Sequence, residues 1–220
     1  MQTTQKKYIF DLDGTLYPFA PGYVSFGESA FYAEICKRVI AYIEVTLDVN
    51  SGEAERIFKK VDSEFNGELS IGFEKVYGID RYEYYKATWR LSPRDYIDDD
   101  PKLVGALAPF QGHALLLTAA PRAWALGALK HLGVVDIFGD NIITGEPDIR
   151  KPNPAVFLQA AKQLNVHPSS IVAIGDQNYS DIVPAKSIGM TTILIGPEKL
   201  DAHYRADSVY DAINVIKEKL

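Results

Sequence analysis

Short apolar runs alternate along most of the chain with longer segments whose apolar residues recur every three or four positions. A short run of β-branched or aromatic residues predicts a buried strand, and helical spacing predicts an amphipathic helix. The expected strands are residues 8–10, 114–118, 142–144, 171–176 and 191–195, and the expected helices between and after them are residues 121–132, 154–164, 179–188 and 211–219.

Residues 18–94 follow a different pattern, because they contain helical spacing without any β-rich run. We expect four helices there, at about 30–47, 52–65, 69–77 and 81–90. Strands separated by helices elsewhere imply a parallel sheet with helices on both faces. The predicted fold class is therefore α/β: a Rossmann-like, doubly wound parallel sheet core formed by residues 1–17 and 95–220, with an inserted all-helical module formed by residues 18–94.

Composition and charge narrow the class of protein. The chain has 220 residues, of which 47% are apolar and 24% charged, which is typical of a folded globular protein. The formal net charge of −6 disfavours a nucleic acid polymer as a partner, because an acidic surface repels the phosphate backbone.

Cys36 is the only cysteine, so no internal disulfide can form and a reducing compartment fits. The polar segment 1–7 lacks the apolar run of a signal peptide, and no stretch is apolar and long enough to span a bilayer. We therefore expect a cytoplasmic protein without a membrane partner.

Four polar segments follow predicted strands or lie near their ends: Asp-Leu-Asp-Gly-Thr at residues 11–15, Thr118, Lys151, and Gly175 with the acidic residues up to position 181. Sites in parallel α/β sheets form outside the carboxyl ends of the strands. Together these segments supply a carboxylate nucleophile, an acid or base, a hydroxyl group and a cation. Metal-assisted phosphoryl transfer needs these groups. Each residue alone also has a simpler explanation, as a turn residue, a helix cap or a helix entry.

The ordered set resembles the haloacid dehalogenase-like hydrolase superfamily, in the branch that has a helical cap inserted after the first motif. The resemblance rests on Asp-x-Asp-Gly-Thr at residues 11–15, the later threonine and lysine, and Gly-Asp-x-x-x-x-Asp at residues 175–181. It extends over nearly the whole chain, and it makes residues 18–94 the expected cap.

The resemblance implies a role for each matching residue. Asp11 would be the nucleophile, form an aspartyl-phosphate and ligate the metal. Asp13 would protonate the leaving oxygen and then deprotonate water, and its main-chain carbonyl would also ligate the metal. Thr118 would donate a hydrogen bond to the phosphate, and Ala119 stands where relatives often have Asn or Gly.

Two further segments complete the implied site. Lys151 would neutralise Asp11 and the phosphate, Asp176 would complete the metal site, and Asp181 would orient Lys151 or the waters of the metal. A carboxylate that attacks a phosphate dianion meets strong repulsion, which a divalent cation and one lysine offset. Because the implied ligands are hard oxygens, we expect Mg²⁺ as the cofactor.

Aromatic residues at both ends of the insert are candidates for substrate specificity. The segments 10–18 and 82–100 resemble the pyrimidine 5′-nucleotidase group of the same superfamily, so we expect a small phosphorylated metabolite, with nucleoside 5′-monophosphates as the leading substrates. Aromatic stripes in short helices also form core, which is the alternative explanation here. The specificity candidates are Tyr17, Tyr23, Tyr85, Trp89 and Arg90.

Other functions remain open at this stage. The first alternative is a phosphatase of sugar phosphates or of phosphoglycolate-like metabolites. A phosphomutase would need a segment of the insert that positions a phosphosugar for return transfer, and no such segment is evident. A non-catalytic phosphate-binding regulator would be favoured if catalytic groups were missing, but Asp11, Asp13, Lys151 and Asp176 are all present.

Overall fold

The structure is a computed structural model, and it describes residues 6–22, 24–197 and 201–220. Contacts divide the chain into two compact units. The sheet unit comprises Met1–Phe26 and Pro93–Leu220, and the helical unit comprises Gly27–Ser92. Residues 18–22, 24–26, 93 and 94, which the sequence prediction placed in the insert, belong to the sheet unit, where the ring centroids of Phe19 and Phe26 lie 5.7 Å apart.

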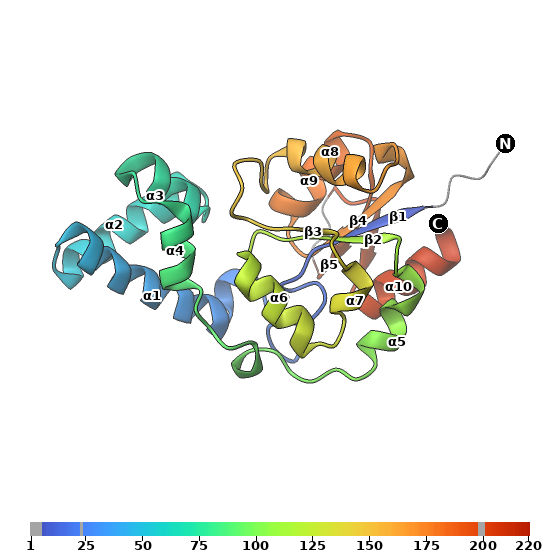
Figure 1. The fold of residues 1–220 in the computed structure, drawn as a ribbon, viewed down its shortest axis with the longest axis horizontal. Coiled ribbons are helices and arrows are strands. Elements are labelled where there is room, and N and C mark those ends of the chain that lie inside the picture. The colour runs from blue at the N-terminus through green and yellow to red at the C-terminus, as the bar shows by residue number, and fades with distance from the viewer. Residues whose placement is uncertain (1–5, 23, 198–200) are drawn as a thin grey trace. The chain divides into compact units, whose positions relative to one another are not determined.

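Within the described residues of the sheet unit, six parallel strands form one sheet in the order β3-β2-β1-β4-β5-β6 (Figure 1). The first strand lies between β2 and β4, so that Ile9 pairs with both Leu115 and Ala173. This arrangement confirms the predicted α/β fold class. The strands are β1 (Lys7–Phe10), β2 (Ala114–Leu117), β3 (Ile142–Ile143), β4 (Ile171–Gly175), β5 (Thr191–Ile195) and β6 (Tyr204–Ala206).

Helices cover both faces of this sheet, with α8 and α9 on one side and α6, α7 and α10 on the other (Figure 1). Side chains alternate along a strand, so neighbouring residues of β1 face opposite sides of the sheet. Ile9 packs in the core cluster that contains Phe157 of α8. The ring centroid of Phe10 lies 6.2 Å from that of Phe138 in α7. The helices of the sheet unit are α5 (Leu103–Leu107), α6 (Arg122–His131), α7 (Val135–Phe138), α8 (Pro154–Gln163), α9 (Val183–Ser187) and α10 (Val209–Lys219), with 3₁₀ turns at Pro93–Asp95, Ala108–Phe110 and Pro168–Ser170.

The helical unit has four α-helices, and polar side chains cap three of them. Ser29, Asn50 and Asp80 accept hydrogen bonds from main-chain N–H groups in the first turns of α1, α2 and α4, which satisfies donors that a helix leaves free. In its core the rings of Phe73 and Tyr84 stack at 5.9 Å. The helices are α1 (Ala30–Leu47), α2 (Ser51–Glu64), α3 (Leu69–Tyr77) and α4 (Arg81–Thr88), preceded by a 3₁₀ turn at Phe26–Glu28.

The segment that was predicted as one helix at residues 179–188 is a π-helical turn, Asn178–Ile182, followed by α9. Pro184 has no N–H group, so the regular α-helical ladder cannot run through it from the preceding turn. The prediction also lacked β6 and α7, which are short: β6 has three residues and α7 has four. In the described residues no helix combines the length and the apolar composition that crossing a bilayer requires.

Candidate functional site

The carboxyl ends of three neighbouring strands bring the predicted polar segments together. Asp11 follows β1, Thr118 follows β2 and Asp176 follows β4, and these strands are adjacent in the sheet. The N–H group of Asp11 donates to the carbonyl of Ile174 at 2.9 Å, so sheet-like hydrogen bonding continues to the carboxylate-bearing residue. All three polar side chains are buried, and each is therefore held in a defined position.

Lys151 precedes α8, and its ammonium group joins two carboxylates. Its Nζ lies 2.6 Å from Oδ1 of Asp11 and 2.5 Å from Oδ1 of Asp181, while its side chain is 2% exposed. Burial lowers the pKa of the Lys151 ammonium, but the charges of Asp11 and Asp181 outweigh burial and hold that pKa above its ordinary value. Lys151 is therefore a fixed cation beside Asp11.

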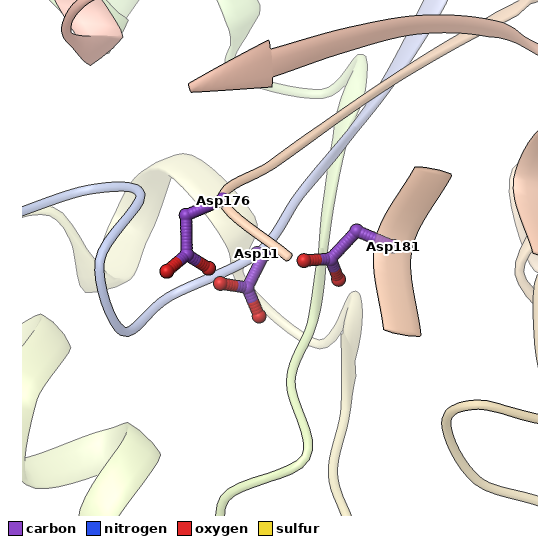
Figure 2. A group of neighbouring side chains, drawn as sticks. All are labelled: Asp11, Asp176 and Asp181. Carbon is purple, nitrogen blue, oxygen red and sulfur yellow. The ribbon is translucent and has the colours of Figure 1, made fainter. Parts of the chain in front are cut away.

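Three carboxyl groups from two segments converge beside this lysine. Oxygens of Asp11, Asp176 and Asp181 all lie within 4.8 Å of one another, and Figure 2 shows the three groups pointing toward a common space. Burial, followed by the charges of Asp11 and Asp181, raises the pKa of Asp176 well above its ordinary value. Burial also raises the pKa of Asp181, against the opposing effect of Lys151. One ammonium thus faces three buried carboxylates.

This donor set fits a hard divalent cation. Oδ1 of Asp176 is buried and accepts no hydrogen bond from the residues that the structure describes, and such an oxygen is costly unless a cation or water satisfies it. Carboxylate oxygens are ligands that Mg²⁺ prefers. Asp13 was predicted as a ligand through its main-chain carbonyl; its side chain is outside the three-carboxylate group, and the carbonyl contact stays a prediction.

Asp13 is buried and receives hydrogen bonds from three side chains. Nε1 of Trp124 donates to Oδ1 at 2.7 Å, the hydroxyl of Tyr17 donates to the same oxygen, and Oγ1 of Thr118 donates to Oδ2 at 3.4 Å. Burial, followed by the charge of Asp11, raises the pKa of Asp13 to about 6, while the hydrogen bonds from Tyr17 and Trp124 oppose that rise. A carboxyl group with such a pKa can both release and take up a proton near neutral pH.

Thr118 and Ala119 form the turn after β2. The Oγ1 atom of Thr118 accepts a hydrogen bond from the N–H group of Ala120 at 3.0 Å, which fixes its rotamer. Ala119 is exposed at this turn. The phosphate contacts expected of both residues stay predictions.

Two glycines allow the carboxylates to approach the main chain. A Cβ atom on Gly14 would lie 2.3 Å from Oδ2 of Asp176, and one on Gly175 would lie 2.4 Å from Cγ of Asp181. Gly14 also has a φ of +80°, which disfavours other residues. The motif glycines are therefore required by the close packing around Asp176 and Asp181.

The specificity candidates are distributed over both units. Tyr17 is 5% exposed in the sheet unit, with its hydroxyl on Asp13, and Tyr23 lies outside the described residues. In the helical unit Tyr85 is buried and its hydroxyl lies 3.1 Å from Oγ of Ser70. The ring of Trp89 packs edge-on against Phe31 at 5.6 Å, and Arg90 is exposed. Their proposed roles in specificity stay predictions, and Tyr17 and Tyr85 have evident packing roles.

Sequence reasoning missed Trp124, whose Nε1 donates a hydrogen bond to Oδ1 of Asp13. It lies in the first turn of α6, is 2% exposed and resembles any core aromatic in the apolar pattern. A buried indole N–H group usually needs an acceptor. Few residues separate Thr118, at the polar end of β2, from the start of α6. This short connection was the available signal that the acceptor of the Trp124 N–H group belongs to the site.

A cavity of about 500 Å³ lies next to Asp176 in the sheet unit. Tyr17, Phe19 and Val209 contribute much of its apolar lining, and its described lining residues include no Lys, Arg or His. Cationic donors favour a phosphate group, and the ammonium of Lys151 lies beside Asp11.

Comparison with known proteins matches this chain to a family. A family model with the description "haloacid dehalogenase-like hydrolase" matches residues 6–189. The glyceraldehyde 3-phosphate phosphatase of Methanopyrus kandleri is 28% identical over 204 residues, which cover 86% of this chain and 83% of that protein. The N-acetylmuramic acid 6-phosphate phosphatase of Pseudomonas aeruginosa is 28% identical over 216 residues, which cover 94% and 90%.

Solved structures match the fold over nearly the whole chain. The crystal structure of a HAD phosphatase from Thermococcus onnurineus has a TM-score of 0.67 and 24% sequence identity, and the match covers 96% of this chain and 98% of that one. At this identity the likeness shows a shared fold.

Proposed function

The chain belongs to the haloacid dehalogenase-like hydrolases, and we propose that it is a magnesium-dependent phosphatase of small phosphate monoesters. The observation that supports this most is that two buried carboxylates have partners of different charge. Asp11 is paired with the ammonium of Lys151, whereas Asp13 is held by neutral donors. One carboxylate is thus suited to attack phosphorus, and the other to transfer protons.

The proposed reaction has two steps. Asp11 attacks phosphorus, the bond to the ester oxygen breaks, and Asp13 gives its proton to the leaving alcohol. Asp13 then accepts a proton from water as the water attacks the aspartyl-phosphate, which releases inorganic phosphate and restores both side chains. Lys151 stays cationic throughout and offsets the negative charge beside Asp11.

The carboxylates of Asp11 and Asp176 would hold Mg²⁺, and the main-chain carbonyl of Asp13 would add a ligand. Asp181, which pairs with Lys151, would orient that lysine or the waters of the metal. The bound cation would supply positive charge against the repulsion between a carboxylate and a phosphate dianion. We also propose that the helical unit, Gly27–Ser92, is the cap of this branch of the family, because it is inserted between β1 and β2.

We propose a phosphorylated sugar or sugar-like metabolite as the substrate. The two relatives described above are named for such substrates, glyceraldehyde 3-phosphate and N-acetylmuramic acid 6-phosphate. Each is a phosphate ester of a primary alcohol, whose alkoxide is a poor leaving group and needs a proton donor such as Asp13. Nucleoside 5′-monophosphates share this ester chemistry, but the aromatic residues that favoured them are packed: the ring of Tyr85 is buried, and the ring of Trp89 contacts Phe31.

A panel of phosphate esters tests the proposal, with Mg²⁺ and with EDTA. We expect hydrolysis with magnesium only, and higher kcat/KM for sugar phosphates than for UMP or CMP. Asp11→Asn should abolish turnover, while Asp136→Asn, which changes an exposed aspartate of α7, should not. A wild type that hydrolyses no ester would support the phosphate-binding regulator instead, and preference for UMP and CMP would restore the nucleotidase hypothesis.

A further inference from the structure

The two oxygens of the Asp13 carboxylate have different partners. Oδ1 accepts two hydrogen bonds, from the indole N–H group of Trp124 at 2.7 Å and from the hydroxyl of Tyr17. Among the described residues, the contact of Oδ2 is a long one, 3.4 Å from Oγ1 of Thr118. Both aromatic donors are almost completely buried, with 2% of Trp124 and 5% of Tyr17 exposed, so solvent does not compete for Oδ1.

The two donors on Oδ1 come from different segments of the sheet unit. Tyr17 belongs to the loop that contains Asp13 itself, and the two residues also form an isolated parallel bridge. Trp124 comes from the first turn of α6, and its ring lies 6.5 Å from that of Tyr96 at an interplanar angle of 66°. The carboxylate is therefore fixed from two directions, by its own loop and by a helix more than a hundred residues later in the chain.

Hydrogen-bonding capacity then distinguishes the two oxygens. A carboxylate oxygen has two lone pairs, and two donors use both of them on Oδ1. An indole N–H group can donate but cannot accept, so Trp124 cannot adjust to a proton placed on Oδ1. A proton on Oδ1 would displace the Trp124 N–H group from that oxygen, whereas a proton on Oδ2 preserves both hydrogen bonds.

We propose that Tyr17 and Trp124 are positioning residues that make Oδ2 the proton-transferring atom of Asp13. The inference rests on the proposed function, because it concerns the residue that protonates the leaving alcohol. The Oδ2–H bond breaks as the proton moves to the ester oxygen, and Oδ2 accepts a proton from water in the second step. Tyr17 and Trp124 keep their own protons throughout.

The leaving group provides the test, because the need for a proton depends on it. A primary alkoxide leaves poorly without protonation, whereas 4-nitrophenolate leaves readily. Loss of a positioning donor should therefore slow the first step for an alkyl phosphate much more than for 4-nitrophenyl phosphate. A residue with a merely structural role would slow both substrates by the same factor.

The experiment compares wild type with Trp124→Phe and Tyr17→Phe, each of which keeps an aromatic ring and removes one donor. Rates of alcohol or nitrophenolate release are measured in the first turnover with Mg²⁺ present. General acid catalysis contributes about 10²–10⁴ in rate, so we expect losses of about 10- to 100-fold for glycerol 3-phosphate. Losses below about threefold are expected for 4-nitrophenyl phosphate, with little change in KM for either ester.

Tyr8→Phe is the matched control, since Tyr8 is a partly buried tyrosine in the same unit whose ring packs against Phe110. It should leave both rates unchanged. Equal losses on both esters in the two variants, or no loss in either, would overturn the positioning role while leaving the phosphatase proposal intact. A wild type that hydrolyses neither these two esters nor any ester of the panel would overturn both. If Trp124→Phe does not fold, Tyr17→Phe tests the same oxygen alone.

Discussion

The sheet unit and the helical unit both bury polar side chains, but the two sets differ in charge. The sheet unit buries four carboxylates and the ammonium of Lys151 within one site, where Asp176 retains an oxygen without a hydrogen-bond donor among the described residues. The helical unit is described throughout residues 27–92, and its buried polar side chains are the hydroxyls of Ser29, Ser70 and Thr88. Each of these has a hydrogen-bond partner within the same unit.

This difference in buried charge indicates that the sheet unit contains the reactive groups, whereas the helical unit contains groups that only stabilise it. Buried charge lowers stability unless it is paired, and the sheet unit retains more carboxylates than Lys151 can pair. The helical unit has no such excess of buried charge, and its aromatic core is packed, as the stacked rings of Phe73 and Tyr84 show. The same type of substitution should therefore change activity when it is made in the sheet unit, and should change only stability when it is made in the helical unit.

The largest expected effect on stability comes from removing the one buried ammonium of the site. Lys151→Met leaves Asp11 and Asp181 without their shared cation, so we expect a loss of about 3–5 kcal/mol in the free energy of unfolding and loss of activity. Lys86→Met is the matched change in the helical unit, where Lys86 pairs with Glu83 at 3.5 Å and both are exposed. That pair should contribute at most about 1 kcal/mol. Urea unfolding of both variants measures the contrast, and equal losses would contradict it.

A second comparison uses two glycines whose added Cβ atoms would meet different neighbours at almost the same distance. The Cβ of Gly14→Ala would lie 2.3 Å from a carboxylate oxygen of Asp176, and that of Gly72→Ala 2.4 Å from Cγ1 of Val61 in the helical unit. Overpacking costs about 1–3 kcal/mol in either place. Only Gly14→Ala should also lower kcat and magnesium affinity, because it moves a proposed ligand.

The backbone conformation of Gly14 requires its own control. Gly22 has a φ of +83°, close to that of Gly14, but nothing lies within 4 Å of an added Cβ. Gly22→Ala therefore measures the cost of the left-handed conformation alone, about 1–2 kcal/mol, without a change in kcat. A loss of activity in Gly72→Ala or Gly22→Ala equal to that in Gly14→Ala would remove the distinction between the units.

The strands and most helices could be predicted because apolar periodicity reports burial directly. The confirmed α/β fold depends on long runs such as residues 171–175, whereas β6 was missed because it is a three-residue edge strand with an exposed Arg205 at its centre. The location of the site followed from parallel strands, since their carboxyl ends share one edge. The hydrogen-bond partners of individual side-chain atoms could not be predicted. The direction in which Trp124 or Tyr85 points depends on tertiary packing, which the spacing of apolar residues does not reveal.

A third prediction concerns the uncompensated carboxylate. Asp176→Asn removes charge that repels Asp11 and Asp181, so we expect the metal-free protein to gain about 1–2 kcal/mol in the free energy of unfolding while losing magnesium-dependent activity. Thermal unfolding in EDTA measures this gain, which corresponds to about 2–4 °C per kcal/mol for a chain of this size. Unchanged or lower stability would mean that Asp176 is well accommodated without a cation.

The pH dependence of that gain has a definite sign. The pKa of Asp176 is raised in the folded state, so the folded protein binds more protons than the unfolded chain as the pH falls. The ionised carboxylate is therefore destabilising above its folded pKa, and the penalty disappears as the pH approaches the unfolded value of about 4. The stability difference between Asp176→Asn and wild type should be largest at neutral pH and should shrink on acidification.

The smallest expected effect is in the helical unit, at the buried contact between Tyr85 and Ser70. Tyr85→Phe leaves the hydroxyl of Ser70 without the partner that lies 3.1 Å away, and the cost should be about 1 kcal/mol. Adding Ser70→Ala should recover part of that cost, because removing both partners is less costly than orphaning one. Urea unfolding of the double-mutant cycle measures the coupling, and kcat/KM for sugar phosphates and for UMP should stay within about twofold of wild type if the hydroxyl only supports packing. A change in the ratio of kcat/KM for sugar phosphates to kcat/KM for UMP would instead support Tyr85 as a specificity residue. The helical unit would then have a role in substrate selection that its neutral core does not predict.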